Sequence, residues 1–180
     1  MIDNFNRNHQ AVRAVLVNQW DWNRRLCGQR MPEEMVFADI RRGTDAEFGL
    51  SIYEPYGISQ FEPLSCGALC VVSNVCGCAG FARRAAGGRD VDNILVADYL
   101  KVAEGLTLQQ LQALPVQERD QIESQENRRL AEVILHRLPR DEQTVARRIA
   151  AGRELASRMS WEHVVGEYLL PSLERAVAPH

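Results

Sequence analysis

Two glutamates, Glu54 and Glu62, are separated by seven residues in a segment that is broken by Pro55 and Gly57. A pair of carboxylates can serve as the acid and the nucleophile of glycoside cleavage. Carboxylates can equally accept hydrogen bonds from sugar hydroxyls, and charge-assisted bonds of that kind contribute roughly 1.5–3 kcal/mol each. The spacing of the glutamates leaves both uses open, so the neighbouring residues must decide between them.

The residues around the two glutamates predict a strand, a loop, a short helix and a second strand. Residues 50–53 are β-prone and lead into Glu54, and the apolar run 68–73 is typical of a buried strand. Between them, Ser59 is a suitable N-cap and Gly67 a suitable residue to follow the helix end. This arrangement places the glutamates on either side of the junction between loop and helix.

The start of the predicted helix offers a place for a phosphate. The backbone N–H groups of Gly57, Ile58 and Ser59 would precede the first intrahelical hydrogen bond, and free donors at a helix N-terminus favour an anion. A hydrolase does not need a phosphate cradle, so this feature disfavours a glycosidase. A structural alternative stays open, because Ser59 and Glu62 also have the spacing of a capping box and Glu54 could be an ordinary carboxylate at a strand end.

The sequence of this segment resembles the E-x7-E signature of the glycosyltransferase group 1 family, which consists of retaining glycosyltransferases with the two-domain GT-B fold. It is most similar to the glycogen and starch synthase branch. A second similarity lies near the C-terminus, where Ser160 and Trp161 resemble the Ser-Trp that opens the closing helix of the same superfamily. The similarity is carried by the residues Glu54, Pro55, Tyr56, Gly57, Ile58, Ser59, Gln60 and Glu62.

The resemblance implies a nucleotide-sugar donor site without a metal or another cofactor. Glu54 would be the catalytic carboxylate and would bond hydroxyls of the donor sugar, and Glu62 would bond the ribose hydroxyls. Tyr56, Gly57, Ile58 and Ser59 would complete the donor-binding set, with main-chain N–H groups toward the sugar and phosphates. ADP-glucose or UDP-glucose is the favoured donor, and the acceptor would be a glycan or another small molecule. The implied enzyme is a hexosyltransferase of carbohydrate biosynthesis.

The predicted fold class is α/β: a partial Rossmann-like domain, the C-terminal domain of the GT-B fold, with three to four parallel strands and a long helical C-terminal region. We expect residues 1–180 to form a single, incomplete, donor-binding domain. The acceptor-binding N-terminal domain of the family and its diphosphate-binding Arg and Lys have no counterpart here. Activity of this chain by itself is therefore in doubt, and an N-terminal glycosyltransferase domain or a homodimer is an expected partner. The alternative is a non-catalytic remnant that acts as a protein-interaction module through its exposed sheet edge and its long helices.

The remaining elements follow from periodicity and capping residues. Helical spacing predicts a helix over residues 8–27, in which Trp20 and Trp22 are core aromatics in preference to a sugar-stacking platform. Residues 35–40 could be a strand or a helix, and we favour a strand. We expect a helical turn over 45–48. Further predictions are a glycine-bearing loop over 74–81, a connector over 85–90 and a strand over 93–99.

From Thr107 onward the sequence predicts helices. Thr107, Asp141 and Ser160 are suitable N-caps, and Pro171 inside the last helix predicts a kink near Tyr168. His136 has no second ligand or base at a useful spacing, and the same holds for His163, so neither is expected to be catalytic. Arg41 and Arg42 could reach a diphosphate, but a solvated pair is the favoured interpretation.

Composition excludes several classes of protein. The formal net charge of −3 provides no general field for nucleic acid, and no apolar stretch approaches the length of a membrane span. We expect a cytoplasmic protein with reduced thiols, because the cysteines are odd in number and two lie in apolar runs. Their spacing does not fit a usual zinc motif, so small buried residues are favoured over a metal or redox centre. These cysteines are Cys27, Cys66, Cys70, Cys76 and Cys78.

Overall fold

The computed structural model describes residues 2–11, 32–51, 54–99, 101 and 105–177. By its internal contacts the chain divides into two compact units, residues 1–40 and 41–180. The first unit contains the helix α1 (Ile2–Asn8). Most of the helix predicted over residues 8–27, including both tryptophans, falls outside the described residues.

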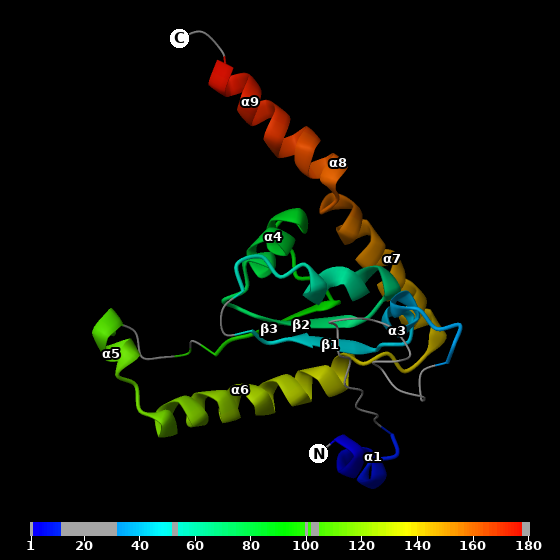
Figure 1. The fold of residues 1–180 in the computed structure, drawn as a ribbon, viewed down its shortest axis with the longest axis vertical. Helices are drawn as coiled ribbons and strands as arrows, with labels where there is room; N and C mark the ends of the chain where they lie inside the picture. Colours follow the sequence, from blue (N-terminus) through cyan, green and yellow to red (C-terminus); the bar gives the residue numbers. More distant parts are fainter. Residues whose placement is uncertain (1, 12–31, 52–53, 100, 102–104, 178–180) are drawn as a thin grey trace. The chain divides into compact units, whose positions relative to one another are not determined.

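The second unit is built on a parallel sheet with the strand order β1-β2-β3 (Figure 1). Its strands are β1 (Ala46–Gly49), β2 (Leu69–Ser73) and β3 (Ile94–Ala97). The central strand β2 is buried along its whole length, as its continuous apolar sequence predicts. The sheet confirms the α/β class and the predicted strands over 68–73 and 93–99.

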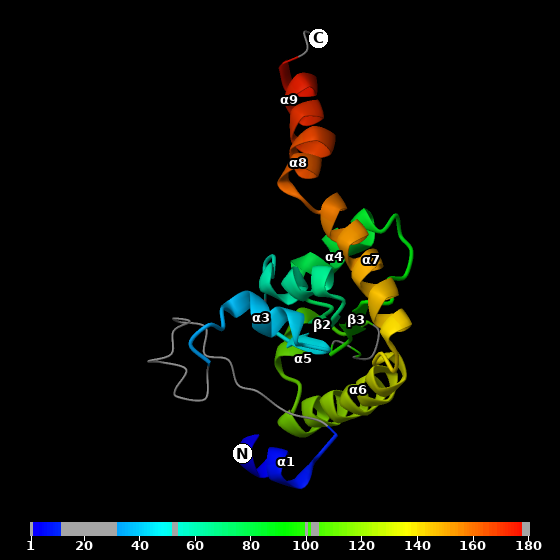
Figure 2. The same ribbon diagram turned by 90° about the vertical axis from the view of Figure 1, so that its right-hand side faces the viewer.

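Helices cover both faces of the sheet. One face carries η1 (Ser59–Cys66), a 3-10 helix, and the α-helices α4 (Gly77–Ala85) and α7 (Glu142–Arg158); the other carries α6 (Val116–Arg137), as Figures 1 and 2 show. Alternate residues of β2 point to the two faces, so Val72 packs with Leu64 and Leu155, while Val71 packs with Leu95 and Leu130. The sheet is thus the middle layer of an open α/β unit.

The C-terminal region is helical, as predicted. It contains α5 (Leu108–Gln112), α6, α7, α8 (Trp161–Val164), the π-helical turn η2 (Val165–Leu169) and α9 (Leu170–Val177). All three predicted N-caps are confirmed: Thr107, Asp141 and Ser160 each accept a hydrogen bond from the N–H three residues on. Near Tyr168, where the sequence predicts a kink, the structure has the π-helical turn η2, which precedes Pro171.

The strand predicted over residues 35–40 is wrong, because this segment enters the helix α3 (Phe37–Arg42). The Asp39 carboxylate accepts the Val36 N–H at 2.9 Å, and such a bond from the third helical residue stabilises a helix start. The helical turn predicted over 45–48 is also wrong, because Ala46–Gly49 is β1. Parallel pairing with β2, together with the bond from Leu69 N–H to the Asp45 carbonyl at 2.9 Å, outweighs the local preference.

Two predictions around the site need correction. The strand expected over 50–53 is displaced toward the N-terminus, since β1 ends at Gly49 and Leu50 and Ser51 lie outside any strand; residues 52–53 are outside the described residues. The loop expected over 74–81 is short, because α4 begins at Gly77. Among the helices within the described residues, none combines the length and the apolar character needed to cross a membrane.

Candidate functional site

Glu54 lies at the carboxyl edge of the sheet. It pairs with Cys76 in an isolated parallel bridge, and its carbonyl oxygen accepts the N–H of Gly77 at 3.1 Å. Gly77 is the first residue of α4, and a Cβ built on it would lie 3.0 Å from the Pro55 carbonyl carbon and nearer still to its oxygen. The loop after Glu54 is therefore seated directly on the start of α4. Ligands of open α/β sheets bind outside this edge.

Gly57 turns the loop in a way that only glycine permits without strain. Its φ is +76°, in the left-handed region. A Cβ at this position would meet Cys76 Sγ at 2.5 Å, Gln60 Oε1 at 2.7 Å and Glu54 Cγ at 2.9 Å. The turn is thus folded tightly over three side chains, and one of them is Glu54. Sequence reasoning did not identify the part played by Gln60, which is buried under this turn.

The helix η1 follows the loop, but its cap differs from the prediction. The N-cap is Ile58, with no side-chain hydrogen bond, and Ser59 Oγ donates to Gln60 Oε1 at 3.3 Å. Gly67 ends the helix with φ +86°, as predicted. The first helical hydrogen bond runs from Phe61 N–H to the Ile58 carbonyl at 3.0 Å. The N–H groups of the residues before Phe61 therefore lie ahead of the first hydrogen bond of the helix. N–H groups in this position can bind an anion at the start of a helix.

Glu62 takes no part in a capping box, so that alternative is wrong. Its Oε2 accepts a hydrogen bond from Arg41 Nη2 at 2.8 Å, and Arg41 Nη1 donates to Glu47 Oε2. A charge-assisted bond to a guanidinium is stronger than a bond to a neutral backbone N–H, which accounts for the choice. The Arg41 side chain is 8% exposed and that of Glu62 47%. The expected solvated position is therefore wrong for Arg41, which sequence reasoning did not connect with Glu62.

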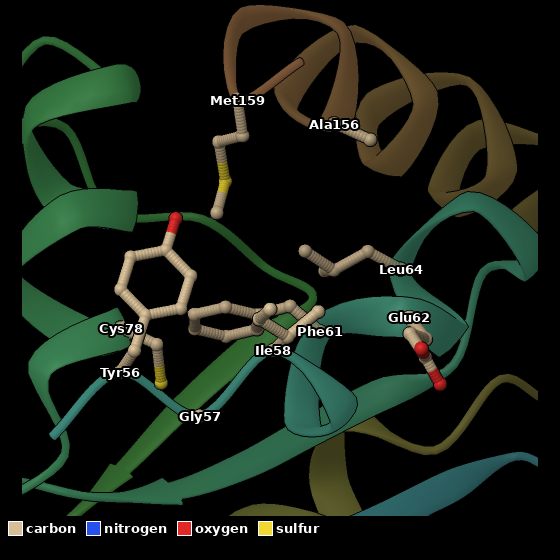
Figure 3. A pocket seen from close by; sticks show the side chains of 9 residues that line it. All are labelled: Tyr56, Gly57, Ile58, Phe61, Glu62, Leu64, Cys78, Ala156 and Met159. Atoms are coloured by element: carbon tan, nitrogen blue, oxygen red, sulfur yellow. The ribbon is translucent and has the colours of Figure 1, made fainter. Parts of the chain in front are cut away.

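A pocket of about 180 Å³ opens beside η1 (Figure 3). Figure 3 shows the rings of Tyr56 and Phe61 near Met159 in a largely apolar wall, while the Glu62 carboxylate is directed away from it. Ligand pockets commonly measure about 300–1,000 Å³, so this pocket has room for part of a nucleotide sugar only. Its lining residues are Tyr56, Gly57, Ile58, Phe61, Glu62, Leu64, Cys78, Ala156 and Met159.

The pocket brings together four residues of the predicted donor-binding set: Tyr56, Gly57, Ile58 and Glu62. Glu54 and Ser59 are not in its lining. Glu54 lies behind Gly57, and Ser59 begins η1 at an exposed position. The predicted set therefore lies along the loop and the first turn of η1, with four of its members at the pocket and Glu54 and Ser59 outside the pocket lining.

The cysteines near the site are packing residues. Cys66, Cys70, Cys76 and Cys78 are free thiols, and Cys27 is outside the described residues. Burial raises the pKa of Cys70 to about 12; burial, with the neighbouring Cys76, also raises the pKa of Cys78. Such thiols stay neutral and make poor nucleophiles or metal ligands. Within the described residues, no group of three or more His, Cys, Asp or Glu side chains could hold a metal ion.

The fold and the site define an open, parallel α/β unit with a glycine turn and one carboxylate, Glu54, at the carboxyl edge of its sheet, and a second carboxylate, Glu62, on η1. No protein-family model matches the chain, and no curated protein matches it at a significant level.

Proposed function

We propose that this chain is the donor-binding part of a retaining GT-B glycosyltransferase, similar to glycogen and starch synthases. The observation that carries the proposal is that the segment from Glu54 to Glu62 begins at the carboxyl edge of a parallel sheet. The Glu54 backbone is bonded to the start of α4, and the Gly57 turn leads into η1. This arrangement supports the expected strand, loop, helix and strand order of a sugar-nucleotide site.

Each proposed role has a physical basis. The main chain of Glu54 is held by Gly77 and Cys76, which leaves its carboxylate to accept hydroxyls of the donor sugar and to act at the reacting carbon. Glu62 would take the ribose hydroxyls. The N–H groups that precede the first bond of η1, with Gly57, Ile58 and Ser59, would face the phosphates. Negative charge grows on the departing diphosphate as an oxocarbenium-like sugar forms, and a helix N-terminus stabilises that charge.

Tyr56 and Ile58 supply the apolar part of the surface. Both are exposed large side chains at the mouth of the pocket, and an aromatic or aliphatic face can pack against a ring of the donor. The pocket is smaller than a whole nucleotide sugar, which supports a site completed by another surface. We propose that an N-terminal glycosyltransferase domain supplies that surface and the glycan or other acceptor, with a homodimer as the alternative. Free thiols fit the reducing cytoplasm.

Calorimetric titration of the purified chain with ADP-glucose, UDP-glucose and GDP-mannose tests the proposal. We expect saturable binding of ADP-glucose or UDP-glucose, weakened about tenfold or more in Glu54→Ala and in Glu62→Ala, because each loses a charge-assisted bond. Glu132→Ala, on the exposed face of α6, is the matched control and should leave affinity unchanged. The donor site would be refuted if the folded parent bound none of the donors. It would also be refuted if neither Glu54→Ala nor Glu62→Ala changed the affinity.

A second candidate function is favoured by a different observation. The last helices expose large apolar side chains, among them Trp161 at 79% and Val177 at 80%, together with Leu170 and Leu173. Exposed apolar surface that gathers in one region marks interaction sites. If donor binding is absent, the non-catalytic interaction module is the better proposal. Sedimentation of the parent and of Leu173→Glu then decides, because concentration-dependent association that the substitution abolishes would place the contact on α9.

A further inference from the structure

We propose that Arg41 is a positioning residue for Glu62, and that it prepares this carboxylate to recognise the ribose of the donor. The inference rests on the proposed donor-binding function and adds a residue to it. Three elements meet at this point: Arg41 at the end of α3, Glu47 on β1 and Glu62 on η1. The guanidinium forms ion pairs with both carboxylates.

The ion pair with Arg41 uses only one of the two carboxylate oxygens of Glu62. Oε2 is held by Arg41 Nη2 at 2.8 Å, whereas Oε1 makes no hydrogen bond to any described residue. Glu62 therefore keeps an acceptor for a ligand hydroxyl while its side chain is already held in place. A free glutamate loses rotamer freedom when it binds, and fixing it beforehand removes that cost from ligand binding.

The burial of Arg41 makes this support rigid. Its side chain is 8% exposed, and a buried guanidinium is tolerated where hydrogen-bonded carboxylates surround it. Glu47 accepts the hydrogen bond from Arg41 Nη1, whereas Glu62 bonds the other terminal nitrogen of the guanidinium. One guanidinium faces two carboxylates here, so the three side chains keep a net negative charge, accept hydroxyl groups and would repel an anion. This charge favours contact with the ribose over contact with the diphosphate.

The fork geometry suggests a conservative test. Lysine keeps the positive charge of Arg41 but presents a single ammonium group, which cannot hold two carboxylates in fixed directions as a planar guanidinium does. Arg41→Lys should therefore preserve the fold and loosen Glu62. Arg42→Lys, the exposed neighbour, is the matched control.

The readout is ribose discrimination, which a purely structural role would not change. Each protein is titrated with the donor that the parent binds and with its 2′-deoxy and 3′-deoxy analogues. We expect the parent to prefer the ribose form by about tenfold, the value of one charge-assisted bond. Glu62→Ala and Arg41→Lys should each bring the preference close to one, and the double variant should lose nothing further, because the two residues act as a unit. Arg42→Lys should discriminate as the parent does.

The outcomes separate the two proposals. A folded parent that binds no nucleotide sugar refutes the proposed function, and the role of Arg41 falls with it. A parent whose ribose preference is lost in Glu62→Ala but kept in Arg41→Lys supports the donor site and overturns the positioning role. If Arg41→Lys does not fold, Arg41→Gln combined with Glu47→Gln removes opposite charges together and leaves only the Glu62 carboxylate without its ion pair, on a side chain that is 47% exposed. Retention of the ribose preference in that variant would also overturn the inference.

Discussion

The backbone of Gly152 lies against the carbonyl group of Leu64. A Cβ built on Gly152 would lie 2.7 Å from the Leu64 carbonyl carbon and nearer still to its oxygen. This is where α7 approaches η1, and Leu64 is fully buried beneath it. The contact holds in place the helix that carries Glu62 and one wall of the pocket.

We therefore predict that Gly152→Ala destabilises the fold. Forcing a methyl group into a tightly packed backbone contact costs about 1–3 kcal/mol, and here backbone must move. Gly80→Ala is the matched control, since Gly80 lies in α4 with nothing within 4 Å of an added Cβ. That change should be neutral or stabilise by up to about 1 kcal/mol, because alanine favours a helix. Denaturant unfolding of both variants measures the difference, and equal effects would contradict the close contact.

The elements that sequence patterns predicted correctly are those with strong local signals. The apolar run that forms β2 can be placed only in the core, and Gly67 ends η1 because the left-handed conformation suits glycine. The caps at Thr107 and Asp141 are equally local, since each side chain reaches an N–H three residues away. These signals involve short stretches of chain and need no knowledge of distant partners.

The predictions that failed depend on distant partners. Residues 46–49 have no strong preference, and pairing with β2 makes them a strand. Ser59 and Glu62 have the spacing of a capping box, but Arg41, which lies 21 residues before Glu62, takes the carboxylate. Gln60 also packs against the backbone of Gly49, so closely that a Cβ on Gly49 would overlap it, and this contact likewise could not be predicted from the sequence. The residues proposed for the donor site come from a resemblance, whereas the contacts that Arg41 and Gln60 make beneath them could be found only in the structure.

A second prediction concerns a buried arginine that lacks a hydrogen bond. Arg148 on α7 is 6% exposed, and its Nη1 is buried without a hydrogen-bond partner among the described residues. Burial lowers its pKa, although the charge of Asp92 opposes that effect. Because a desolvated guanidinium with poor pairing contributes little, Arg148→Met should be neutral or stabilise by up to about 2 kcal/mol.

Thermal unfolding of Arg148→Met checks this expectation. Arg147→Met, the exposed neighbour on the same helix, is the control and should change stability by less than about 0.5 kcal/mol. A clear loss of stability in Arg148→Met, beyond that of the control, would mean that the buried guanidinium has a structural partner or a bound anion.

A third prediction is a pH dependence of stability at Glu126. This residue of α6 is 3% exposed; it accepts hydrogen bonds from Arg129 Nε at 2.9 Å and from Asp98 N–H at 2.8 Å. The bond from Arg129, with that from Asp98, holds its pKa below the ordinary value near 4.5. A carboxyl group with a depressed pKa in the folded state stabilises the fold fully above the unfolded pKa, and this stability is lost as the pH falls through the folded pKa.

Glu126→Gln should therefore lower the free energy of unfolding at neutral pH by roughly 1.5–3 kcal/mol, the value of a hydrogen bond to a charged group. The deficit should shrink as the pH falls below about 4.5, since the parent then loses the same charge. Glu123→Gln, exposed on the same helix, is the control. Urea unfolding over this pH range gives the comparison, and a deficit that stays constant with pH would count against the ionised Glu126.

The last prediction concerns the thiols under the loop. Cys70 has a pKa of about 12 because of its burial, whereas Cys66 is partly exposed at the end of η1. Near pH 8 the thiolate fraction of Cys70 should be on the order of a thousandfold below that of an ordinary cysteine. In a Cys27→Ser background, a thiol reagent should label Cys66 in the native protein and reach Cys70 and Cys78 only in urea.

Peptide mass spectrometry of the labelled protein identifies each site, and the same experiment with added zinc tests the metal alternative. Zinc should leave the labelling rate of Cys66 unchanged, because the described residues bring no set of three ligands together. Rapid native labelling of Cys70, or protection of Cys66 by zinc, would revive a redox or metal role for the cysteines. Slow labelling of Cys70 and Cys78 would instead mean that they serve as small apolar side chains of β2 and α4 in the core between the sheet and its helices.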